Sequence, residues 1–185
     1  MAPLLLLCLS WRMFSQVKTV VCSFCLKSGI LCQKCSARLR SGEITELDLS
    51  VARLLLSLEE KYPALQSVTF YRVVDAGGTL ALIVGSGDVP RLLGFGGKIM
   101  RALGDLTGKS VRVLECGGDD RKFLEDLFAP LSIMTINTIW LPDGSTETRV
   151  ILGRRRGSHM RFDVNALKEI AQKVRNMTLR VEFAD

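Results

Sequence analysis

Four of the six cysteines in this 185-residue chain lie within fourteen residues, as two C-x-x-C pairs. The first pair is Cys22 and Cys25, and the second, Cys32 and Cys35, follows after six residues. Four thiolates can complete a tetrahedral sulfur shell that suits zinc, and a shell filled by cysteine leaves no open position for water or a substrate. The spacing therefore predicts one structural zinc ion in a knuckle of two hairpins over residues 21–40. An iron–sulfur ligand set and redox-active C-x-x-C pairs are the alternatives.

The residues around these cysteines are basic. Lys27, Lys34, Arg38 and Arg40 would offset the negative charge of four thiolates around a zinc ion. A segment this short cannot bury a hydrophobic core. We therefore expect its order to depend on the metal, whose binding contributes on the order of 10 kcal/mol in comparable fingers.

A second stretch has the composition of a phosphate-binding loop. Gly94, Gly96 and Gly97 lie within four positions, and a helical pattern that carries Lys98 and Arg101 follows them. Glycines lack a Cβ atom, so a polyanionic backbone can approach closely. The free N–H groups and the dipole of the following helix also favour negative charge.

The chain lacks residues on which common enzymes depend. A nucleotidase P-loop is excluded, because counting back from Gly97 and Lys98 places Leu92 at its first glycine and Ile99 at its hydroxyl position. The single histidine, His159, provides little material for acid–base chemistry. We therefore expect a protein that is not an enzyme and has no small-molecule substrate.

The composition indicates a globular protein with a polyanionic partner. Hydrophobic residues make up 48% of the chain and aromatic residues 6%, which is typical of an aliphatic core rather than a disordered chain. The net charge of +6 favours nucleic acid or an anionic surface as partner. Cys8 and Cys116 stand alone, so a secreted disulfide framework is not expected. We expect a reducing, cytoplasmic setting instead.

The apolar N-terminus, residues 1–20, is expected to be a leader. Its hydrophobic run over 3–9 is too short to span a bilayer and lacks a charged n-region and a cleavage site, so no membrane association is expected. Met13 offers a second start. Three interpretations stay open for this leader: an over-extended or disordered segment, a helix on the core, and a targeting segment.

The rest of the chain divides into two similar units. The first unit, 43–116, is expected to contain a helix (46–62), a hairpin (68–74 and 79–84), a short helix (89–93), the glycine loop, a helix and a strand (110–115). The second unit, 117–185, is expected to contain a helix capped by Asp119 or Asp120, a hairpin (133–141 and 146–152), a basic loop, a helix capped by Asp163 and a strand (178–183). Both units are α+β.

The element order around the glycine loop resembles that of type II K homology (KH) domains. Their signature is an apolar residue followed by G-x-x-G, as in the stretch from Leu93 to Ile99. Two such units in tandem, with Phe128-Ala129-Pro130 opening the second hairpin, are similar to the KH pair of the NusA family of transcription elongation and termination factors. Archaeal NusA-like proteins also carry a preceding cysteine cluster, and the resemblance spans about 21–183.

The resemblance implies a three-stranded mixed sheet packed on helices in each unit and binding of about four nucleotides of single-stranded RNA by the first unit. Ile99 would contact a base or belong to the core. The central loop positions, Phe95 and Gly96, carry no cation, so charge would come from the flanks. The implied RNA-binding residues of the first unit are Arg91, Gly94, Phe95, Gly96, Gly97, Lys98 and Arg101.

The second unit has no G-x-x-G and is expected to be degenerate. Its basic loop would contribute Arg154, Arg155, Arg156 and Arg161 to RNA binding, or form only a solvated loop. The expected function is that of a NusA-like transcription elongation or termination factor that binds single-stranded RNA, with RNA polymerase as a further partner. The alternative is a zinc-dependent adaptor that docks on RNA polymerase or a ribonucleoprotein and contacts RNA only secondarily.

Overall fold

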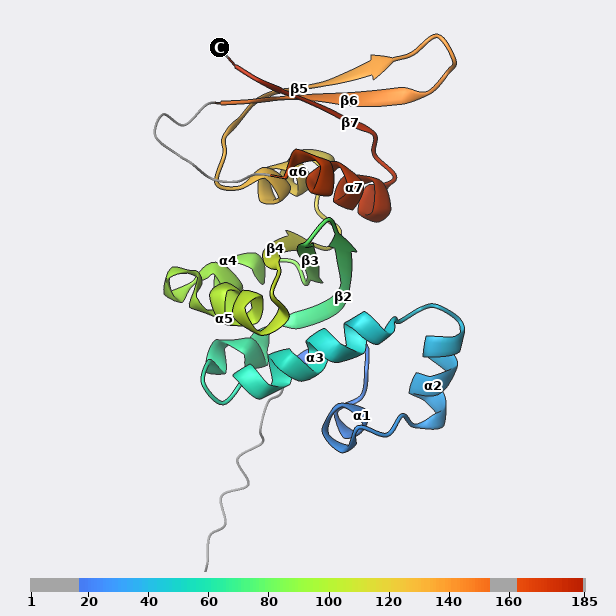
Figure 1. Cartoon of the computed structure of the whole chain (residues 1–185), viewed down its shortest axis with the longest axis vertical. Helices are drawn as coiled ribbons and strands as arrows, with labels where there is room; N and C mark the ends of the chain where they lie inside the picture. The colour runs from blue at the N-terminus through green and yellow to red at the C-terminus, as the bar shows by residue number, and fades with distance from the viewer. Residues whose placement is uncertain (1–16, 154–162, 185) are drawn as a thin grey trace, which may run out of the picture.

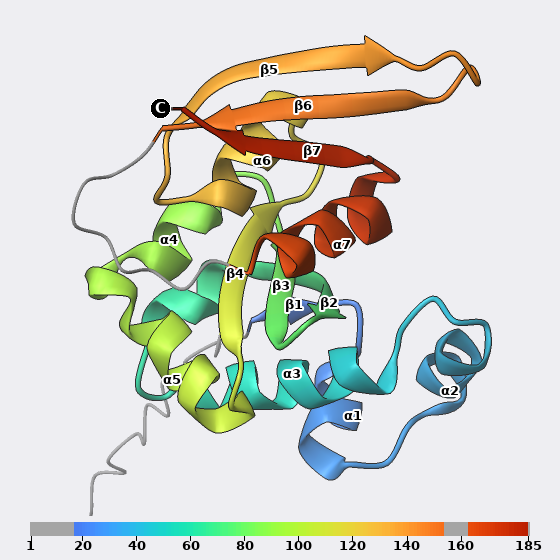
Figure 2. The same ribbon diagram turned by 45° about the horizontal axis from the view of Figure 1, so that its top comes forward.

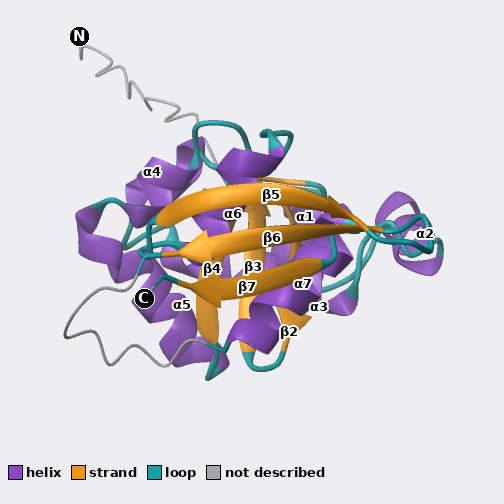
Figure 3. Cartoon of the chain, turned by 90° about the horizontal axis from the view of Figure 1, so that it is seen from above, coloured by secondary structure: helices purple, strands orange, loops and turns teal. Residues whose placement is uncertain are grey.

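The computed structural model describes residues 17–153 and 163–184, which form two β-sheets and the helices around them. The elements are stacked in four layers: a layer of helices, the first sheet, a pair of helices and the second sheet (Figure 1). Figure 3, seen from above, shows the strands of the second sheet running across those of the first. The expected mixed α+β class, with sheets packed on helices, is confirmed.

The first sheet has the strand order β1-β2-β3-β4. Its strands are β1 (Lys18–Thr19), β2 (Thr69–Ala76), β3 (Thr79–Val84) and β4 (Ser110–Glu115). β2 and β3 form an antiparallel hairpin through Gly77 and Gly78, both of which have positive φ angles. β4 runs parallel to β3, so the chain between them must cross over the sheet.

One face of this sheet is covered by three helices. They are α3 (Glu46–Leu58), α4 (Val89–Leu93) and α5 (Lys98–Thr107), with the short 3-10 helix η1 (Pro63–Ser67) beside them. Leu55 of α3, Leu82 of β3 and Leu103 of α5 belong to the same buried cluster. The crossover from β3 to β4 therefore places α4 and α5 on the sheet.

The opposite face of the first sheet is covered by helices of the second unit. These are α6 (Asp120–Phe128) and α7 (Val164–Arg175), which lie between the two sheets in Figures 1 and 2. Ala81 and Ile83 of β3 share a buried cluster with Phe123 of α6 and Ile170 of α7. Because alternate residues of a strand point to opposite faces, all six residues of β3 are buried.

The second sheet closes the stack with the order β5-β6-β7. Its strands are β5 (Ile133–Trp140), β6 (Thr146–Leu152) and β7 (Leu179–Phe183). β5 and β6 are antiparallel, and β7 runs parallel to β6. Val150 and Leu152 pack on the same cluster as α6 and α7, so this helix pair has a sheet on each side.

Polar side chains begin the main helices where the sequence analysis expected caps. Asp119 accepts a hydrogen bond from the N–H of Lys122 at 2.7 Å, and Asp163 accepts one from the N–H of Ala166 at 3.1 Å. Thr45 and Asp48 form a capping box at the start of α3. Asp48, which is 2% exposed, also accepts from the N–H of Val73 at 2.6 Å and so ties α3 to β2.

The structure differs from the sequence-based expectations in three places. Lys18 and Thr19, inside the range expected to be a leader, form β1 and add a fourth strand parallel to β2. The helix expected over 46–62 ends at Leu58. The two C-x-x-C segments begin helices rather than forming hairpins. Residues 1–16 lie outside the described part of the chain.

Phe123→Ala is expected to weaken the first sheet even though Phe123 belongs to the second unit. Phe123 is 1% exposed in the cluster that also contains Ala81 and Ile83, and loss of such a ring costs about 3–5 kcal/mol. Amide hydrogen exchange should show faster exchange throughout β3. Unchanged protection of β3 would mean that the units unfold independently. Phe183→Ala, at a phenylalanine that is 45% exposed, is the matched control and should have little effect.

Asp48→Ala is expected to cost about 2–4 kcal/mol of unfolding free energy, because it removes the capping-box carboxylate that accepts from the N–H of Thr45 and leaves the buried N–H of Val73 without its acceptor. Urea denaturation measures this loss. Glu46→Ala, at an exposed position in the first turn of the same helix, should cost less than about 0.5 kcal/mol. Equal losses in the two variants would contradict the role given to Asp48.

Candidate functional site

Two short helices hold the four cysteines. In α1 (Ser23–Ser28) Cys22 is the N-cap residue and Cys25 lies in the first turn, and in α2 (Gln33–Arg40) Cys32 and Cys35 have the same positions. Gly29 ends α1 in a left-handed conformation with φ of 76°. The thiols therefore meet at two helix N-termini, where free N–H groups and the helix dipole stabilise thiolates.

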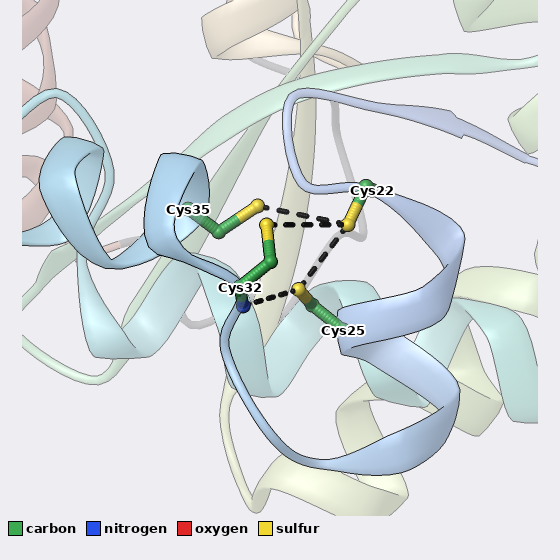
Figure 4. A group of neighbouring side chains, drawn as sticks. All are labelled: Cys22, Cys25, Cys32 and Cys35. Carbon is green, nitrogen blue, oxygen red and sulfur yellow. Dashed lines mark hydrogen bonds between the residues drawn. The ribbon is translucent and has the colours of Figure 1, made fainter.

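The four sulfur atoms form a compact group (Figure 4). The Sγ atom of Cys22 lies 3.2 Å from that of Cys25, 3.9 Å from that of Cys32 and 3.8 Å from that of Cys35. All four Sγ atoms lie within 4.8 Å of one another. With Zn–S bonds of about 2.3 Å, a tetrahedral shell has sulfur atoms about 3.8 Å apart. The group therefore fits one metal ion, and the ion's identity is not determined by this geometry.

Burial and hydrogen bonding give these thiols different acidities when no metal is bound. The N–H of Cys32 donates to the Sγ atom of Cys25 at 3.0 Å and acts to lower its pKa, but burial and the neighbouring thiols outweigh this and raise the pKa of Cys25 to about 12. The N–H of Cys35 and the neighbouring thiols lower the pKa of Cys32 to about 6. A metal ion must therefore displace the proton of Cys25 at neutral pH.

The cysteine cluster is attached to the body of the protein by polar contacts and by β1. The guanidinium of Arg38 donates to the carbonyl oxygen of Val20 at 2.8 Å and lies 3.3 Å from the carboxylate of Glu43. The N–H of Val17 donates to the buried carboxylate of Glu59 at 3.4 Å. A hollow of about 360 Å³ opens beside Cys22 between β1, α1 and α3.

The glycine loop lies between α4 and α5, and each of its glycines has a structural reason. A Cβ atom at Gly94 would lie 3.2 Å from the carbonyl oxygen of Pro90, so a side chain there would press on α4. Gly96 and Gly97 have φ angles of 67° and 70°, with nothing within 4 Å of a Cβ at either position. The loop is thus left-handed, and its surface is open. It leads into α5, whose N-terminus has no side-chain cap among the described residues.

The cationic side chains near the loop differ in how far neighbouring groups already neutralise their charge. Lys98 is exposed, and the guanidinium of Arg101 donates to the carbonyl oxygen of Gly96 at 3.5 Å. Arg91 forms an ion pair with Asp88 at 2.5 Å, so its charge is largely offset. Asp88 is 3% exposed and also accepts from the N–H of Thr69 at 2.8 Å, which fixes the start of α4. Asp88 is a positioning residue that the sequence analysis did not identify.

Two apolar residues beside the loop have different environments. Ile99 is 0% exposed and belongs to the core, so it cannot contact a base. Leu93, which precedes Gly94, is 48% exposed and is the apolar surface next to the loop that the sequence analysis missed. The side chain of Phe95 and the residues Arg154, Arg155, Arg156 and Arg161 lie outside the described part of the structure.

Comparisons with known proteins find a relative in sequence and a solved structure with a similar fold. No family model matches the chain. The probable transcription termination protein NusA of Methanocaldococcus jannaschii is 34% identical over 62 residues, which make up 34% of this chain and 32% of that protein. This match therefore spans about a third of each chain and indicates a NusA-like region. The crystal structure of APE1850 matches 76% of this chain and all of its own with a TM-score of 0.50 and 19% identity, which indicates a shared fold.

Within residues 17–153 and 163–184, no helix is both long enough and apolar enough to cross a membrane.

The metal affinity of the cysteine cluster is expected to rise steeply with pH. Burial and neighbouring thiols raise the pKa values of Cys25 and Cys35, so both thiols carry protons at neutral pH and release them on binding. Each proton released on binding adds about a tenfold increase in the binding constant per pH unit, so these two thiols alone give about 100-fold. Competition with a chromophoric chelator at pH 6, 7 and 8 measures this slope, and a pH-independent affinity would contradict it.

Purified protein is expected to contain one metal ion per chain, and Cys25→Ser is expected to lose it. Elemental analysis measures the number of metal ions per chain. The colour of the protein solution separates zinc from an iron centre, because Zn²⁺ has a filled d shell and is colourless. Cys116→Ser is the matched control, since Cys116 is exposed and stands apart from the cluster. Metal retained by Cys25→Ser would exclude the four-cysteine site.

Proposed function

We propose that this protein is a NusA-like, single-stranded-RNA-binding protein that acts in transcription elongation or termination. The observation that carries the proposal is the match to archaeal NusA, a probable transcription termination protein. The basic charge of the chain, +6, suits a polyanionic partner. RNA polymerase is the protein partner expected for such a factor.

The order of elements in the first unit supports a type II KH assignment. The order α3, β2, β3, α4, α5, β4 has the glycine loop between its second and third helices, where the KH signature belongs. The second unit has the order α6, β5, β6, α7, β7, without the short helix and the glycine loop. We assign RNA binding to the first unit and treat the second as a degenerate KH domain.

In this proposal the RNA backbone lies on the open side of the glycine loop. Gly96 and Gly97 leave room for a phosphate, and the uncapped N–H groups at the start of α5 can donate hydrogen bonds to its oxygen atoms. Lys98 and Arg101 supply the cations. Leu93 offers an apolar surface to a base. Phosphate contacts of this kind position a strand without reading its sequence, so discrimination among sequences should be modest.

The cysteine centre has a structural role in this proposal, and the protein is not an enzyme. Four cysteine ligands leave a metal ion without an open position for water or a substrate. A zinc ion would join α1 to α2, two helices of six and eight residues that are too short to be stable alone. A cytoplasmic setting, where thiols stay reduced, is part of the same proposal.

A second candidate function is that of a protein-interaction adaptor. The observation that favours it is the exposed end of the β5–β6 hairpin, where Trp140 is 77% and Leu141 38% exposed. Exposed apolar residues of this size are typical of docking surfaces. Pull-down with and without ribonuclease separates the two functions, because partners that remain bound after ribonuclease treatment contact the protein directly.

The double change Phe95→Asp with Gly96→Asp is expected to weaken binding of a fluorescent oligoribonucleotide at least about tenfold, or 1.4 kcal/mol. It places two negative charges at the proposed phosphate site. Gly96 has open space around it, but its positive φ angle strains any side chain there, and the control at Gly117 carries the same strain. Anisotropy titration measures the affinity, and circular dichroism checks the fold.

The matched control is Cys116→Asp with Gly117→Asp, which adds the same charge at another exposed glycine with a positive φ angle and open space. It should bind RNA about as well as the unaltered protein. Equal affinities of the glycine-loop variant and this control would overturn the assignment. Three or four released counterions also predict a log–log salt slope of about −2 to −3.

A further inference from the structure

Helix α1 and the residues that follow it present two large apolar side chains to solvent, Phe24 in the first turn and Ile30 just after the C-cap Gly29. Phe24 is 65% exposed and Ile30 is 72% exposed, although the neighbouring Cys25 and Leu26 are buried. Phe24 lies inside the first C-x-x-C pair, so the fold of the cluster holds its backbone in place. A metal shell does not require an aromatic residue at this position. Phe24 is therefore available for contact with a partner.

The surroundings of these two side chains are cationic. Lys27 is exposed and lies three residues after Phe24 in α1, which places both on the same side of the helix. The guanidinium of Arg53, from α3, donates to the carbonyl oxygen of Gly29 at 3.4 Å, next to Ile30. We call Phe24, Lys27, Ile30 and Arg53 the α1 face.

The charge balance of the whole segment selects the kind of partner. From Val17 to Gly42 the chain contains five cations and no carboxylate. Four thiolates around a divalent ion carry a charge of −2, so the loaded segment remains positive. The first carboxylate that follows, Glu43, is paired with Arg38. The partner that fits exposed aromatic and cationic groups together is a polyanion with flat apolar faces.

We propose that the α1 face is a second contact for single-stranded RNA, in which a base stacks on Phe24 and the backbone phosphates lie near Lys27 and Arg53. The inference rests on the proposed RNA-binding function and adds a site to it. An unpaired base has an apolar π-face and a charged backbone, which match the two kinds of side chain on the α1 face.

The position of the α1 face allows short and long RNA strands to distinguish the two proposed sites. α1 contacts α3, and α3 in turn contacts α5, which follows the glycine loop. Figures 1 and 2 show α1 apart from the loop region of α4 and α5, with α3 running between them. The 13 residues of α3 span about 20 Å. The glycine loop of a KH domain clamps about four nucleotides, so a four-nucleotide strand is held at that loop alone, whereas a longer strand can continue to the α1 face.

Phe24→Ala is expected to weaken binding of a fifteen-nucleotide oligouridine by about fivefold to a hundredfold, the usual effect of losing one base–aromatic stack. It should leave binding of a four-nucleotide oligouridine at the glycine loop unchanged. Anisotropy titrations use the full, metal-loaded chain, with metal content and circular dichroism as checks of folding. Phe183→Ala, at another exposed phenylalanine, is the matched control and should not change either affinity.

Lys27→Glu tests the electrostatic part of the α1 face. It should reduce the salt slope of fifteen-nucleotide binding, whereas Phe24→Ala should leave that slope unchanged. Lys61→Glu, an equal charge change at another exposed lysine, should keep the slope. Unchanged fifteen-nucleotide affinity in folded Phe24→Ala and Lys27→Glu variants would overturn the proposal.

The same titrations separate this site from the glycine loop. If Phe24→Ala weakens fifteen-nucleotide binding while the Phe95, Gly96 double variant does not, the α1 face stands and the glycine-loop assignment fails. If only the double variant weakens binding, the glycine loop stands and the α1 face fails. Binding of a polyglutamate peptide tests whether the α1 face binds an acidic protein instead. If Phe24→Ala loses binding of the peptide and keeps its affinity for RNA, the α1 face binds an acidic protein and the proposed RNA contact is wrong.

Discussion

The rest of the structure depends on the burial of β3 on both faces. Leu80, Leu82 and Val84 point into one cluster, and Ala81 and Ile83 point into the other, so a single helical layer cannot cover this strand. α3, α4 and α5 cover the first face, and the second unit supplies α6 and α7 for the other. The two units therefore share a hydrophobic core across their junction. Each unit contributes burial that the other cannot provide alone.

Both candidate sites lie at the margin of this core, on segments that it holds in place. β1 and the contact of α1 with α3 attach the cysteine cluster to strand β2 and to the helical layer. The crossover from β3 to β4 positions the glycine loop, and Asp88 fixes the start of α4 through Thr69 and Arg91. A rigid scaffold with exposed loops and short helices at its edge is the arrangement on which binding sites are commonly built.

In the function we propose, both sites bind rather than make bonds. A metal ion held by four cysteines would have no free ligand position, and the open glycine loop offers N–H groups with cations nearby. Charge complementarity is therefore the main resource of this surface. It works over distance and depends on salt, which agrees with the long, flexible polyanion that we propose as the partner.

The sequence by itself determined the features that depend on local chemistry. The positions of most helices and strands, the caps Asp119 and Asp163, and the four-cysteine set follow from periodicity, side-chain hydrogen bonding and ligand spacing, which act over a few residues. Only the tertiary structure decided what depends on contacts between distant segments: the pairing of β1 with β2, the burial of Ile99, the pairing of Arg91 with Asp88, and the placement of α6 and α7 between two sheets. The sequence shows that a side chain is apolar, but it does not show whether that side chain contacts a base, the core of its own unit or the neighbouring unit. Which neighbour covers it is a property of the whole fold.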